Sequence, residues 1–583
     1  MKFLLLSVPV LDLQYPPSSP AIIKSCLLSA GHEASVFDTN ILMYNLARDS
    51  QHFVELSNLF EVCGTSTQWN NYTEALFDTE HDIINQWLDI ITNKISDVKP
   101  DWLGISVFSY KSHKAAILIS LIAKQKFPKL KIVVGGRGAS SYPFGPDAAS
   151  FSKKLLEIFN KKVIGEKFGQ TLVNTGLADS FIEGDGEQAI IELANNSQAN
   201  IVGDISKIDL ETVPTPNYDD YDLSLYEYIN EPTLSITGSK GCVRQCTFCD
   251  IPVLWPKFKF RSGEHIANEM LELKQRYGVN KFYMSDSLVN GSMKAFMDFT
   301  GRLAEYNTQN PDDTIRWVGQ YITRPVNQIP PGYYEKLKLS GGEGLTIGAE
   351  SGSNSVRKHM RKKFSTYDLD TEIAEFSKNG IVCVLLFFSS YPTETWQDFE
   401  DTCDMLMRYM PYYADSTVYK ITLGIPYTHH ANTPLWNMQE EIGLNYDIST
   451  DVLWLMNDNK ELTFYERIRR RLILQELSFA LNLPLSRNAA ELNQLRYTLQ
   501  FHLTKIEEFF GKCPDIKVYP DYYNLTDYDQ VLMPPELQIK VMECRNSNLE
   551  NIKKIKTFNV DTLDNIGYDK QGYVELKQAL GEI

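Results

Sequence analysis

Short apolar runs alternate with helical patterns along the first two hundred residues. The predicted strands are Lys2–Val8, Ala34–Asp38, Trp102–Phe108 and Lys131–Val134. Apolar residues at helical spacing predict helices at Pro20–Ala30 and His113–Lys126. This alternation is typical of a doubly wound α/β domain with a parallel sheet, in which ligands bind beyond the carboxyl ends of the strands. We therefore predict such a domain over residues 1–204, with binding loops after Val8, Phe108 and Val134.

A second alternating series occupies residues 231–440. A stretch without periodicity, rich in Pro and Asp, precedes it and predicts a linker over residues 205–230. The predicted strands of the second series are Leu234–Thr237, Lys281–Ser285, Ile315–Tyr321, Gly344–Gly348, Ile381–Phe388 and Val418–Leu423. Six βα units of this spacing predict a partial (βα)6 barrel, with its function in the loops at the carboxyl ends of the strands.

The last part of the chain, residues 441–583, has a mainly helical and irregular pattern. Helices are predicted at Glu461–Leu483 and Ala489–Phe510. The run Arg467–Arg471 has the composition of a nucleic-acid patch, but acidic residues alternate nearby, and we predict a solvated helix face. The region contains no motif that indicates a function, and we expect it to cover the mouth of the barrel or to dock against the barrel.

Composition and charge exclude several classes of protein. The 583 residues correspond to about three or four domains. With 43% hydrophobic and 22% charged residues, the chain is not a disordered or fibrous protein. Its 57 Lys and Arg against 74 Asp and Glu give a net charge of −17, so a nucleic-acid partner is not expected, although a local basic groove stays open.

The location of the protein follows from its apolar runs and its cysteines. No run approaches the roughly 18 to 20 apolar residues needed to span a bilayer. The apolar start of the chain could pass for a signal peptide, but Asp12 and Gln14 stand where a small-residue cleavage site belongs, so we predict a buried strand. Nine cysteines are too sparse for a disulfide framework. We expect a cytoplasmic protein with reduced thiols and no membrane contact.

Three of the nine cysteines, Cys242, Cys246 and Cys249, form a C-x3-C-x2-C motif directly after the first predicted barrel strand. Structural zinc prefers four closed ligands, and the nearest further candidate is His265, so zinc and three unrelated cysteines are the weaker alternatives. Cubane iron–sulfur clusters are held by Cys thiolates. Three thiolates leave one of four irons without a protein ligand, and an open position makes a metal site catalytic. The motif therefore predicts a catalytic [4Fe–4S] cluster.

This motif, with Phe248 before the third cysteine and in a loop after the first strand of a βα barrel, resembles that of the radical S-adenosylmethionine (SAM) enzymes. The resemblance implies that the open iron binds the amino and carboxylate groups of SAM. It also implies that an electron from the cluster cleaves SAM to a 5′-deoxyadenosyl radical, which abstracts a substrate hydrogen. An external electron donor such as flavodoxin or ferredoxin is expected. The cofactor supplies the chemistry, and the protein supplies orientation and water exclusion.

Further segments match this family in the same order over residues 231–440. They are Phe260–Glu264, Phe282–Ser287, Ile347–Ser353 and Tyr391–Thr395. By this resemblance the candidate SAM contacts are Phe248, Asp286, Ser287, Gln320, Arg324, Glu350 and Ser351. Three alternatives stay open: Phe248 packs in the core, Asp286 caps a helix, and Arg324 pairs with an acid. No residue is assigned a catalytic role.

A doubly wound domain ahead of such a barrel resembles the cobalamin-binding subgroup of the family. The matching segments are Tyr15–Pro20, Gly31–Glu33, Ser106–Ser109, Gly135–Gly138 and Phe181–Glu187. Small residues let backbone amides approach a bulky ligand, so the candidate cobalamin contacts are Ser106, Ser109, Gly135, Gly136 and Gly138. The alternative is that these are turn glycines of any α/β sheet. The chain has no D-x-H-x-x-G motif, so no histidine ligand to cobalt is expected, and His32 and His113 are expected at the surface or in a satisfied core.

We hypothesise a cobalamin-dependent radical SAM enzyme that methylates an unactivated carbon or phosphorus centre of a small molecule or peptide. A radical enzyme for rearrangement or ring formation, with an auxiliary or degenerate cobalamin domain, is the alternative. A methylthiotransferase would carry a second cysteine set in its first domain, whereas Cys26 and Cys63 lie far apart there. A non-catalytic iron–sulfur or zinc-stabilised protein is the fourth possibility. The sequence does not identify the substrate.

Overall fold

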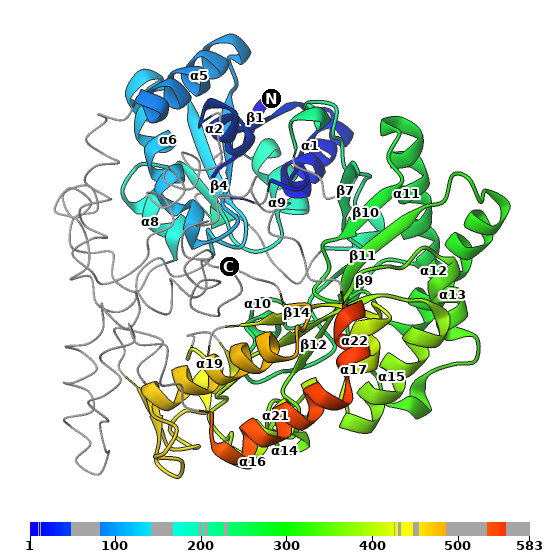
Figure 1. Cartoon of the computed structure of the whole chain (residues 1–583). Coiled ribbons are helices and arrows are strands. Elements are labelled where there is room, and N and C mark those ends of the chain that lie inside the picture. Colours follow the sequence, from blue (N-terminus) through cyan, green and yellow to red (C-terminus); the bar gives the residue numbers. More distant parts are fainter. Residues whose placement is uncertain are drawn as a thin grey trace. The chain divides into compact units, whose positions relative to one another are not determined.

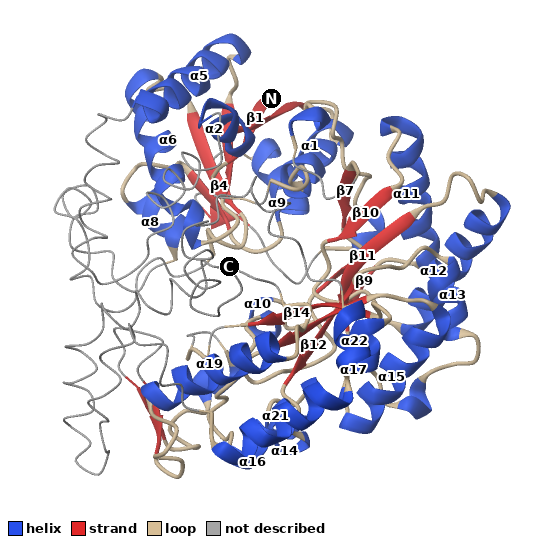
Figure 2. Ribbon diagram, in the orientation of Figure 1, coloured by secondary structure: helices blue, strands red, loops and turns tan. Residues whose placement is uncertain are grey.

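The computed structural model describes residues 1–9, 11, 13–47, 82–140, 167–196, 201–202, 208–226, 231–424, 426–429, 433–446, 454–485 and 533–555. These residues divide into two compact units. The first comprises Met1–Ile236 with Asn268–Tyr283, and the second comprises Thr237–Ala267 with Met284–Asp564. Each unit is built around parallel strands (Figures 1 and 2).

The first unit contains a six-stranded sheet in the order β2-β1-β3-β4-β5-β6. Its strands are β1 (Lys2–Ser7), β2 (Glu33–Asp38), β3 (Trp102–Ser106), β4 (Lys131–Gly135), β5 (Ser180–Ile182) and β6 (Ile201–Val202). All neighbouring strands in this sheet pair in parallel. The order is that of a doubly wound sheet whose switch point lies between β1 and β3. The predicted fold of this part of the chain is confirmed.

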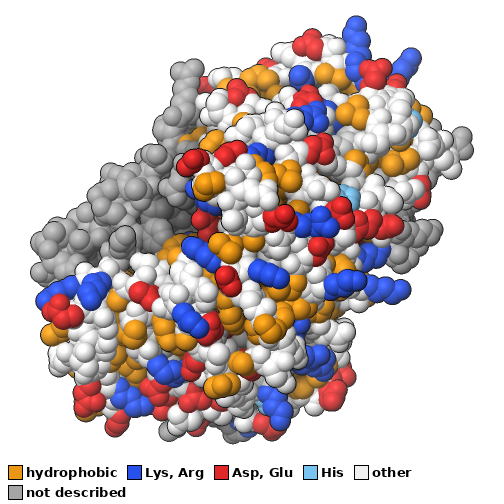
Figure 3. Space-filling view, turned by 90° about the vertical axis from the view of Figure 1, so that its right-hand side faces the viewer, with side chains coloured by type: hydrophobic (Ala, Val, Ile, Leu, Met, Phe, Trp, Pro, Cys, Tyr) orange, Lys and Arg blue, Asp and Glu red, His pale blue; other side chains and the backbone are white. Residues whose placement is uncertain are grey.

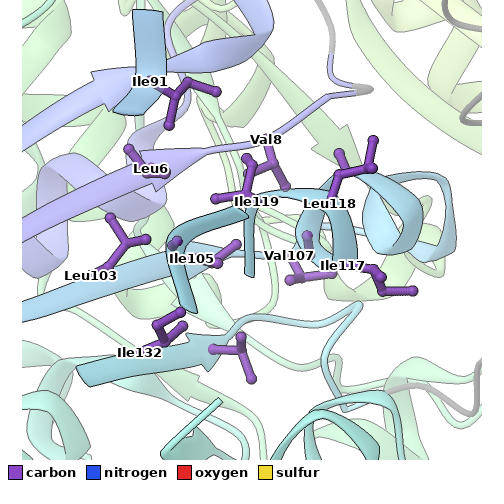
Figure 4. Packing of buried hydrophobic residues seen from close by; sticks show 14 of the residues in the cluster. Leu6, Val8, Ile91, Leu103, Ile105, Val107, Ile117, Leu118, Ile119 and Ile132 are labelled. Atoms are coloured by element: carbon purple, nitrogen blue, oxygen red, sulfur yellow. The ribbon is translucent and has the colours of Figure 1, made fainter. Parts of the chain in front are cut away.

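Helices cover this sheet and bury its strands. They are α1 (Ser18–Ser29), α2 (Thr39–Ala47), α5 (Asp82–Val98), α6 (His113–Lys126), α8 (Phe168–Asn174) and α9 (Gly186–Asn195), with short 3-10 turns at Tyr110–Ser112, Leu210–Thr212 and Leu223–Leu225. Five of the six residues of β1 are buried, because a strand with helices on both faces becomes a continuous apolar run. Side chains of β1, β3, β4, α5 and α6 meet in one core (Figure 4).

The predicted linker is packed against its surroundings within the first unit. The carboxylate of Asp220 accepts a hydrogen bond from the backbone N–H of Val36 on edge strand β2 (2.7 Å). It also forms an ion pair with Lys24 on α1 (2.5 Å). One residue earlier, Asp219 binds Arg276 and Tyr277 at the end of α11 (Gly263–Tyr277). Residues 208–226 therefore hold α1, β2 and the end of α11 together.

The second sheet has the order β7-β10-β11-β12-β13-β14, which follows the chain. Its strands are β7 (Thr233–Ile236), β10 (Lys281–Met284), β11 (Arg316–Tyr321), β12 (Leu345–Glu350), β13 (Cys383–Phe387) and β14 (Val418–Leu423). The helices of this region are α10 (Ile251–Leu254), α11, α12 (Met293–Gln309), α13 (Tyr333–Leu339), α14 (Asn354–His359), α15 (Thr366–Asn379), α16 (Trp396–Arg408), α17 (Met410–Ala414) and α18 (Pro434–Asn437), with a 3-10 turn at Val326–Gln328. Because β7 and β14 are the two edges of this sheet, it is the partial (βα)6 barrel that the sequence predicts.

The C-terminal region extends the second unit. It contains the antiparallel pair β15 (Leu444–Tyr446) and β16 (Trp454–Met456), followed by α19 (Phe464–Ala480), α21 (Pro535–Ser547) and α22 (Leu549–Lys554). The backbone N–H of Ile421 on edge strand β14 donates to the carbonyl of Pro484 (2.8 Å), just after α19. This contact protects an exposed strand edge. The predicted helix Ala489–Phe510 lies outside the described residues.

One prediction about α19 is wrong. The arginine run does not form a solvated face, because Arg467, Arg470 and Arg471 are 1%, 2% and 4% exposed. Each contacts protein: Arg467 stacks on Trp454, Arg470 pairs with Glu394, and Arg471 donates to backbone carbonyls. Guanidinium groups can be buried when carboxylates, aromatic faces and carbonyls surround them, and a sequence pattern does not show such partners.

The surface adds two observations. Among the described helices, none is both long and apolar enough to span a bilayer. On the face shown in Figure 3, Lys and Arg side chains lie among Asp and Glu side chains over the described residues. Such a mixed face has no single-sign field of the kind that attracts a polyanion.

His113 provides a pH-dependent test of the first unit. Its buried ring stacks on Phe168 with centroids 3.9 Å apart, and Nε2–H donates to the Gly138 carbonyl (2.9 Å). Burial lowers the pKa of His113 to about 4, although the bond to Gly138 opposes this shift. Since the unfolded chain binds the proton more tightly, the contribution of His113 is complete above pH 6.5 and is lost as the pH falls toward 4.

We predict that His113→Phe removes this acid sensitivity. Phenylalanine keeps the stacking and loses the titratable group. The wild type should lose about 3 kcal/mol of unfolding free energy between pH 6.5 and 4 that the variant does not lose. Calorimetric unfolding of both full-length proteins across this range measures the difference. Parallel stability curves for the two proteins would contradict the assignment.

Candidate functional site

The three cysteines lie in one loop beyond the carboxyl end of β7. They stand between the two-residue strand β8 (Ser239–Lys240) and helix α10. Cys246 is buried, Cys242 and Cys249 are half-buried, and all three are free thiols. The other described cysteines lie in separate elements, at Cys26, Cys383, Cys403 and Cys544. The loop therefore brings together the three predicted cluster ligands and no other described cysteine.

Asp286 fixes the chain just before this loop. Its carboxylate, 3% exposed, accepts a hydrogen bond from the backbone N–H of Gly238 (2.9 Å). Burial raises the pKa of Asp286 to about 6, while bonds from Ser239 and Gly238 oppose the rise. The alternative that Asp286 caps a helix is wrong, because Ser292 is the N-cap of α12. Asp286 thus connects the end of β10 to the start of the cysteine loop.

Gly241, next to the first cysteine, requires the freedom of glycine. Its φ is +81°, and a Cβ at this position would lie 3.0 Å from the Lys257 carbonyl and 3.2 Å from the Trp255 Cβ. The ribbon formed by β8 and β9 (Lys259–Phe260) folds the chain back here. Any side chain would push the first cysteine away from this ribbon.

The inner side of the cysteine loop is anchored to the barrel through Thr247. Its backbone N–H donates to the Met360 carbonyl (3.2 Å), and its own carbonyl accepts from the backbone N–H of Leu435 (2.7 Å). Its hydroxyl lies 2.8 Å from the hydroxyl of Tyr391. These three contacts attach the loop to the segment after α14, to the segment after β13 and to α18.

Phe248 and an ion pair form the neighbouring wall. Phe248 is half-buried and meets Phe388 edge-on, with ring centroids 5.2 Å apart. The Nζ atom of Lys362 lies 5.7 Å from the centre of the Phe248 ring and 2.9 Å from a carboxylate oxygen of Glu350. The Lys362 and Glu350 side chains are 11% and 12% exposed. Two predicted SAM contacts, Glu350 and Phe248, thus lie beside each other, and Glu350 forms a largely buried ion pair.

Charges around the cysteines affect their protonation. Burial raises the pKa of Cys242 and Cys246, while Lys362 and Arg244 lower it, and burial raises that of Cys249 to about 12. In the absence of metal these thiols are protonated at neutral pH. A metal that binds here displaces the protons, and the two cations favour the resulting thiolates.

Two strand ends at this edge have left-handed backbone. Glu350, the last residue of β12, has φ +63°, and Ser390, three residues after β13, has φ +67°. The register of β12 and β13 shifts at the same place, between Gly348 and Glu350. Non-glycine residues in this region carry strain that surrounding contacts must hold, and such positions cluster at functional sites.

The remaining predicted SAM contacts lie at neighbouring strand ends. Arg324 donates to the carbonyls of Asn290 (2.6 Å) and Gly291 (2.7 Å), so it binds backbone, and the alternative of an acid partner is wrong for the described contacts. Gln320, half-buried at the end of β11, and Ser287, half-buried after β10, lie at the same edge. Ser351 is buried, and its hydroxyl accepts from the backbone N–H of Ser353 (3.1 Å).

The predicted cobalamin contacts also share one edge, that of the first sheet. Ser106 and Gly135 are paired in register at the ends of β3 and β4. Gly136 has φ +104°, and a Cβ there would lie 2.5 Å from the Val107 carbonyl oxygen. A Cβ on Gly138 would lie 2.7 Å from the backbone of Ser109. Packing between the two loops therefore explains Gly136 and Gly138 without a ligand.

Gly135 is different, because packing does not require it. A Cβ at Gly135 would lie 3.4 Å from the Cβ of Ile182, which is close to ordinary contact. Nearby, Phe108 follows β3 with 60% of its surface exposed. A large exposed aromatic residue beside a switch point is a feature that the strand pattern alone did not single out.

Comparison with known proteins identifies the barrel. Residues 236–406 match the Radical SAM superfamily. The chain carries a radical SAM domain. Such a domain works with a [4Fe–4S] cluster and SAM, and its matched segment begins at the end of β7 and includes the cysteine loop.

Relatives extend the likeness to the rest of the chain. An uncharacterized methyltransferase of Pyrococcus horikoshii is 22% identical over 403 residues, which cover 67% of this chain and 80% of the relative. The anaerobic magnesium-protoporphyrin IX monomethyl ester cyclase of Synechocystis is 20% identical over 325 residues, which cover 52% and 58%. The solved structure of OxsB, a cobalamin-dependent SAM radical enzyme, covers all of this chain and 81% of its own, with TM-score 0.55 and 14% identity. This last likeness is one of fold.

Four residues of the radical SAM domain that sequence patterns missed are Arg244, Thr247, Lys362 and Tyr391. Arg244 lies in the cysteine motif itself, and its pKa is lowered by burial and then by the nearby Arg324. Lys362 stands in a basic turn after α14, and no periodicity indicates that it reaches Glu350. Thr247 also lies in the cysteine motif and Tyr391 lies in the turn after β13, so only Lys362 stands outside the segments that match the family.

Among the described residues, no group of three His, Cys, Asp or Glu side chains is placed to bind a single metal ion. Each cysteine of a cubane binds a different iron, so cluster ligands surround a volume instead of a point. The donor set fits the cluster: three thiols in one loop, largely buried, with two cations nearby.

We predict that replacing Cys242, Cys246 and Cys249 with Ala abolishes the broad iron–sulfur absorption. The circular dichroism of the apo chain should be unchanged, because the loop adds no sheet hydrogen bonds beyond the short β8–β9 ribbon. Iron and sulfide per chain after anaerobic reconstitution are the measurement, with Cys544→Ser as the matched control. Four irons per chain in the triple variant would refute the assignment.

Proposed function

We propose that the protein is a cobalamin-dependent radical SAM enzyme that methylates an unactivated carbon or phosphorus centre of a small molecule or peptide. The observation that carries this proposal is the combination, in one chain, of two features. One is the cysteine loop of a radical SAM domain, and the other is a parallel sheet of order β2-β1-β3-β4-β5-β6 with binding loops at its switch point. The fold likeness to a cobalamin-dependent enzyme and the similarity to a methyltransferase support it.

In this proposal Cys242, Cys246 and Cys249 hold the cluster, and one iron keeps a position for SAM. When bound, the cluster supplies the electron that cleaves SAM, and cobalamin supplies a transferable methyl group. The chain's own residues orient the ligands and exclude water. Thr247 and Asp286 hold the two sides of the cysteine loop.

The SAM contacts are assigned by place and charge. Arg324 lies close enough to Arg244 to lower its pKa, after the larger effect of burial, and the two guanidinium groups together favour a carboxylate near the cluster. Gln320 and Ser287 offer polar groups at the ends of β11 and β10. Glu350, held by Lys362, offers carboxylate oxygens to hydroxyl groups. The buried Ser351 supports the turn behind Glu350.

The first unit holds cobalamin at the carboxyl ends of β1, β3 and β4. Ser106 and Gly135 end β3 and β4, Ser109 lies in the loop after β3, and Phe108 in the same loop offers an exposed apolar face to a bulky ring system. Gly136 and Gly138 bring the β4 loop against the β3 loop, where the N–H of Gly138 donates to the Val107 carbonyl (2.9 Å). The backbone N–H of Gly136 is therefore the candidate donor to the ligand.

An acidic carrier such as flavodoxin or ferredoxin is proposed as the electron donor. Residues 238–262, which surround the cysteines, contain five Lys and Arg and one Asp, in a chain of net charge −17. Val243 and Val253 in this segment are 37% and 39% exposed. Arg261 is buried, and the other basic residues with the two valines give a locally basic, partly apolar surface that fits an acidic partner.

Ring formation is the alternative function, and the similarity to a cyclase supports this alternative. A methylthiotransferase is less well supported, because Cys26, buried in α1, is the only cysteine among the described residues of the first unit. A non-catalytic role does not agree with a radical SAM domain.

We predict that reconstituted protein with SAM, cobalamin and a reductant forms 5′-deoxyadenosine and S-adenosylhomocysteine together when an acceptor is present. Methyl transfer consumes a second SAM, whereas ring formation yields 5′-deoxyadenosine alone. The reaction is run with a pool of candidate acceptors, and chromatography then measures the amounts of both products. The triple cysteine variant is the control. If 5′-deoxyadenosine forms without S-adenosylhomocysteine, methylation is wrong and ring formation takes its place as the proposed function.

We predict that Phe108→Asp weakens cobalamin binding at least tenfold. The side chain is mostly exposed, so the apo fold should tolerate the change, while a charge would face the apolar ring. Leu28→Asp is the matched control, because Leu28 is 42% exposed on α1 of the same unit. Titration of the apo proteins with hydroxocobalamin, followed by absorbance, gives both affinities. Equal affinity in Phe108→Asp and wild type would reject this placement.

A further inference from the structure

Helix α19 reaches the radical SAM site through buried arginines. Arg470 donates from Nη1 to the Glu394 carboxylate (2.9 Å) and to the carbonyls of Glu394 (3.1 Å) and Thr395 (3.2 Å). Its Nε donates to Glu466 on the same helix (3.1 Å). The Arg470 and Glu394 side chains are 3% and 1% exposed. Four acceptors thus fix this guanidinium group in a region without bulk water.

Glu394 passes this restraint to the strained residue after β13. Its carboxylate accepts the backbone N–H of Ser390 (2.8 Å), and Ser390 has φ +67°. A left-handed serine that is fully buried needs such a bond, because the conformation itself is unfavourable. The contact with Arg470 orients the carboxylate for this role and opposes the effect of burial, which raises its pKa.

The residue after Ser390 makes the contact with the cysteine loop. Tyr391 is 2% exposed, and its hydroxyl lies 2.8 Å from that of Thr247, between Cys246 and Cys249. The contacts therefore form a continuous series from α19 to the cluster ligands. They run from Arg470 to Glu394, from Glu394 to the backbone beside Tyr391, and from Tyr391 to Thr247.

A second residue from the same region holds the same turn. The Asn459 side chain, before α19, donates to the carbonyls of Pro392 (3.3 Å) and Glu394 (3.0 Å). On the neighbouring strand, Arg471 donates to the carbonyls of Leu423 (3.1 Å) and Gly424 (2.9 Å) at the end of β14. Side chains from residues 459–471 thus bind backbone at the carboxyl ends of the last two barrel strands.

We propose that Arg470 is a positioning residue of the radical SAM site, and that α19 belongs to this site as a support. By holding the 390–395 turn through Glu394, Arg470 sets the place of Tyr391 and so of the cysteine loop. The inference deepens the proposed function and rests on it for its SAM-dependent readouts. It assigns a role to a region in which the sequence shows no motif.

The first arm of the test uses the ligand-free, full-length protein. In Arg470→Met the amides of residues 388–395 and 243–249 should exchange hydrogen at least tenfold faster than in wild type. Arg469→Gln is the matched control, because Arg469 lies on the same helix and pairs with Glu466, and its described ion pairs do not include Glu394. It should leave exchange in both segments unchanged. Unchanged exchange at 243–249 in a folded Arg470→Met would overturn the proposal.

The second arm uses the reconstituted protein. Arg470→Met should keep its iron content, since the three cysteines are intact. Its rate of SAM cleavage should fall about tenfold or more, because small displacements of reacting groups slow a reaction strongly. The change that SAM causes in the electron paramagnetic resonance spectrum of the reduced cluster should weaken in parallel. A purely structural role would lower the unfolding temperature and leave the spectrum and the rate per cluster unchanged, and this result would overturn the proposal.

Two further variants keep the test decisive. Tyr391→Phe removes only the last hydroxyl contact, so it should reproduce the spectral and exchange effects even if Arg470→Met does not fold. Normal behaviour of Tyr391→Phe in both arms would overturn the proposal. Glu394→Gln retains an acceptor for Ser390 and Arg470, so its amide hydrogen exchange rates in both segments should stay close to those of the wild type. If wild type itself shows no spectral response to SAM, the proposed function fails, while the ligand-free arm still decides the role of Arg470.

Discussion

In a parallel sheet every strand ends at the same edge, and the loops beyond that edge lose their ladder hydrogen bonds. Their buried backbone N–H and C=O groups need other hydrogen-bond partners, because an unpaired buried group destabilises the fold. In the second unit, charged side chains supply them: Asp286 accepts from Gly238, Arg324 donates to Asn290 and Gly291, and Glu394 accepts from Ser390. The cysteine loop lies among these restraints. Its surroundings therefore depend on charged side chains from three different parts of the chain.

The same arrangement explains the electrostatics of the site. Buried carboxylates such as Asp286 and Glu394 have raised pKa values, of about 6 and about 7, because burial disfavours their charged forms and nearby donors offset this only in part. Cations also gather near the cysteines, with Lys362 and Arg244 favouring thiolates. The protein thus provides a positive surrounding for three thiolates while keeping its own acids bonded to backbone. A neutral loop of the same shape would hold a negatively charged cluster less well.

The first unit uses a different means to bring loops together. Close backbone approach, made possible by Gly136 and Gly138, places the loop after β4 against the loop after β3. Charged groups have little part in this contact, and the buried His113, with its lowered pKa, braces it from α6. The loop after β3 also carries one exposed aromatic residue, Phe108. The first unit therefore joins its loops mainly through glycines, whereas the second uses charged side chains.

The sequence alone determined both sheets and the cluster motif. Strands such as Lys2–Ser7 and Cys383–Phe387 carry apolar residues on both faces. Burial on both faces produces a short continuous apolar run, which is typical of a strand in a covered parallel sheet. The cysteine spacing is local, so the three thiols share a loop whatever the rest of the fold does. Only the tertiary structure showed that Lys362 meets Glu350, that Asp286 binds Gly238 and that the arginines of α19 are buried. These contacts join residues 12, 48 and 76 positions apart, and no periodicity records which distant acid or carbonyl a charged side chain will reach.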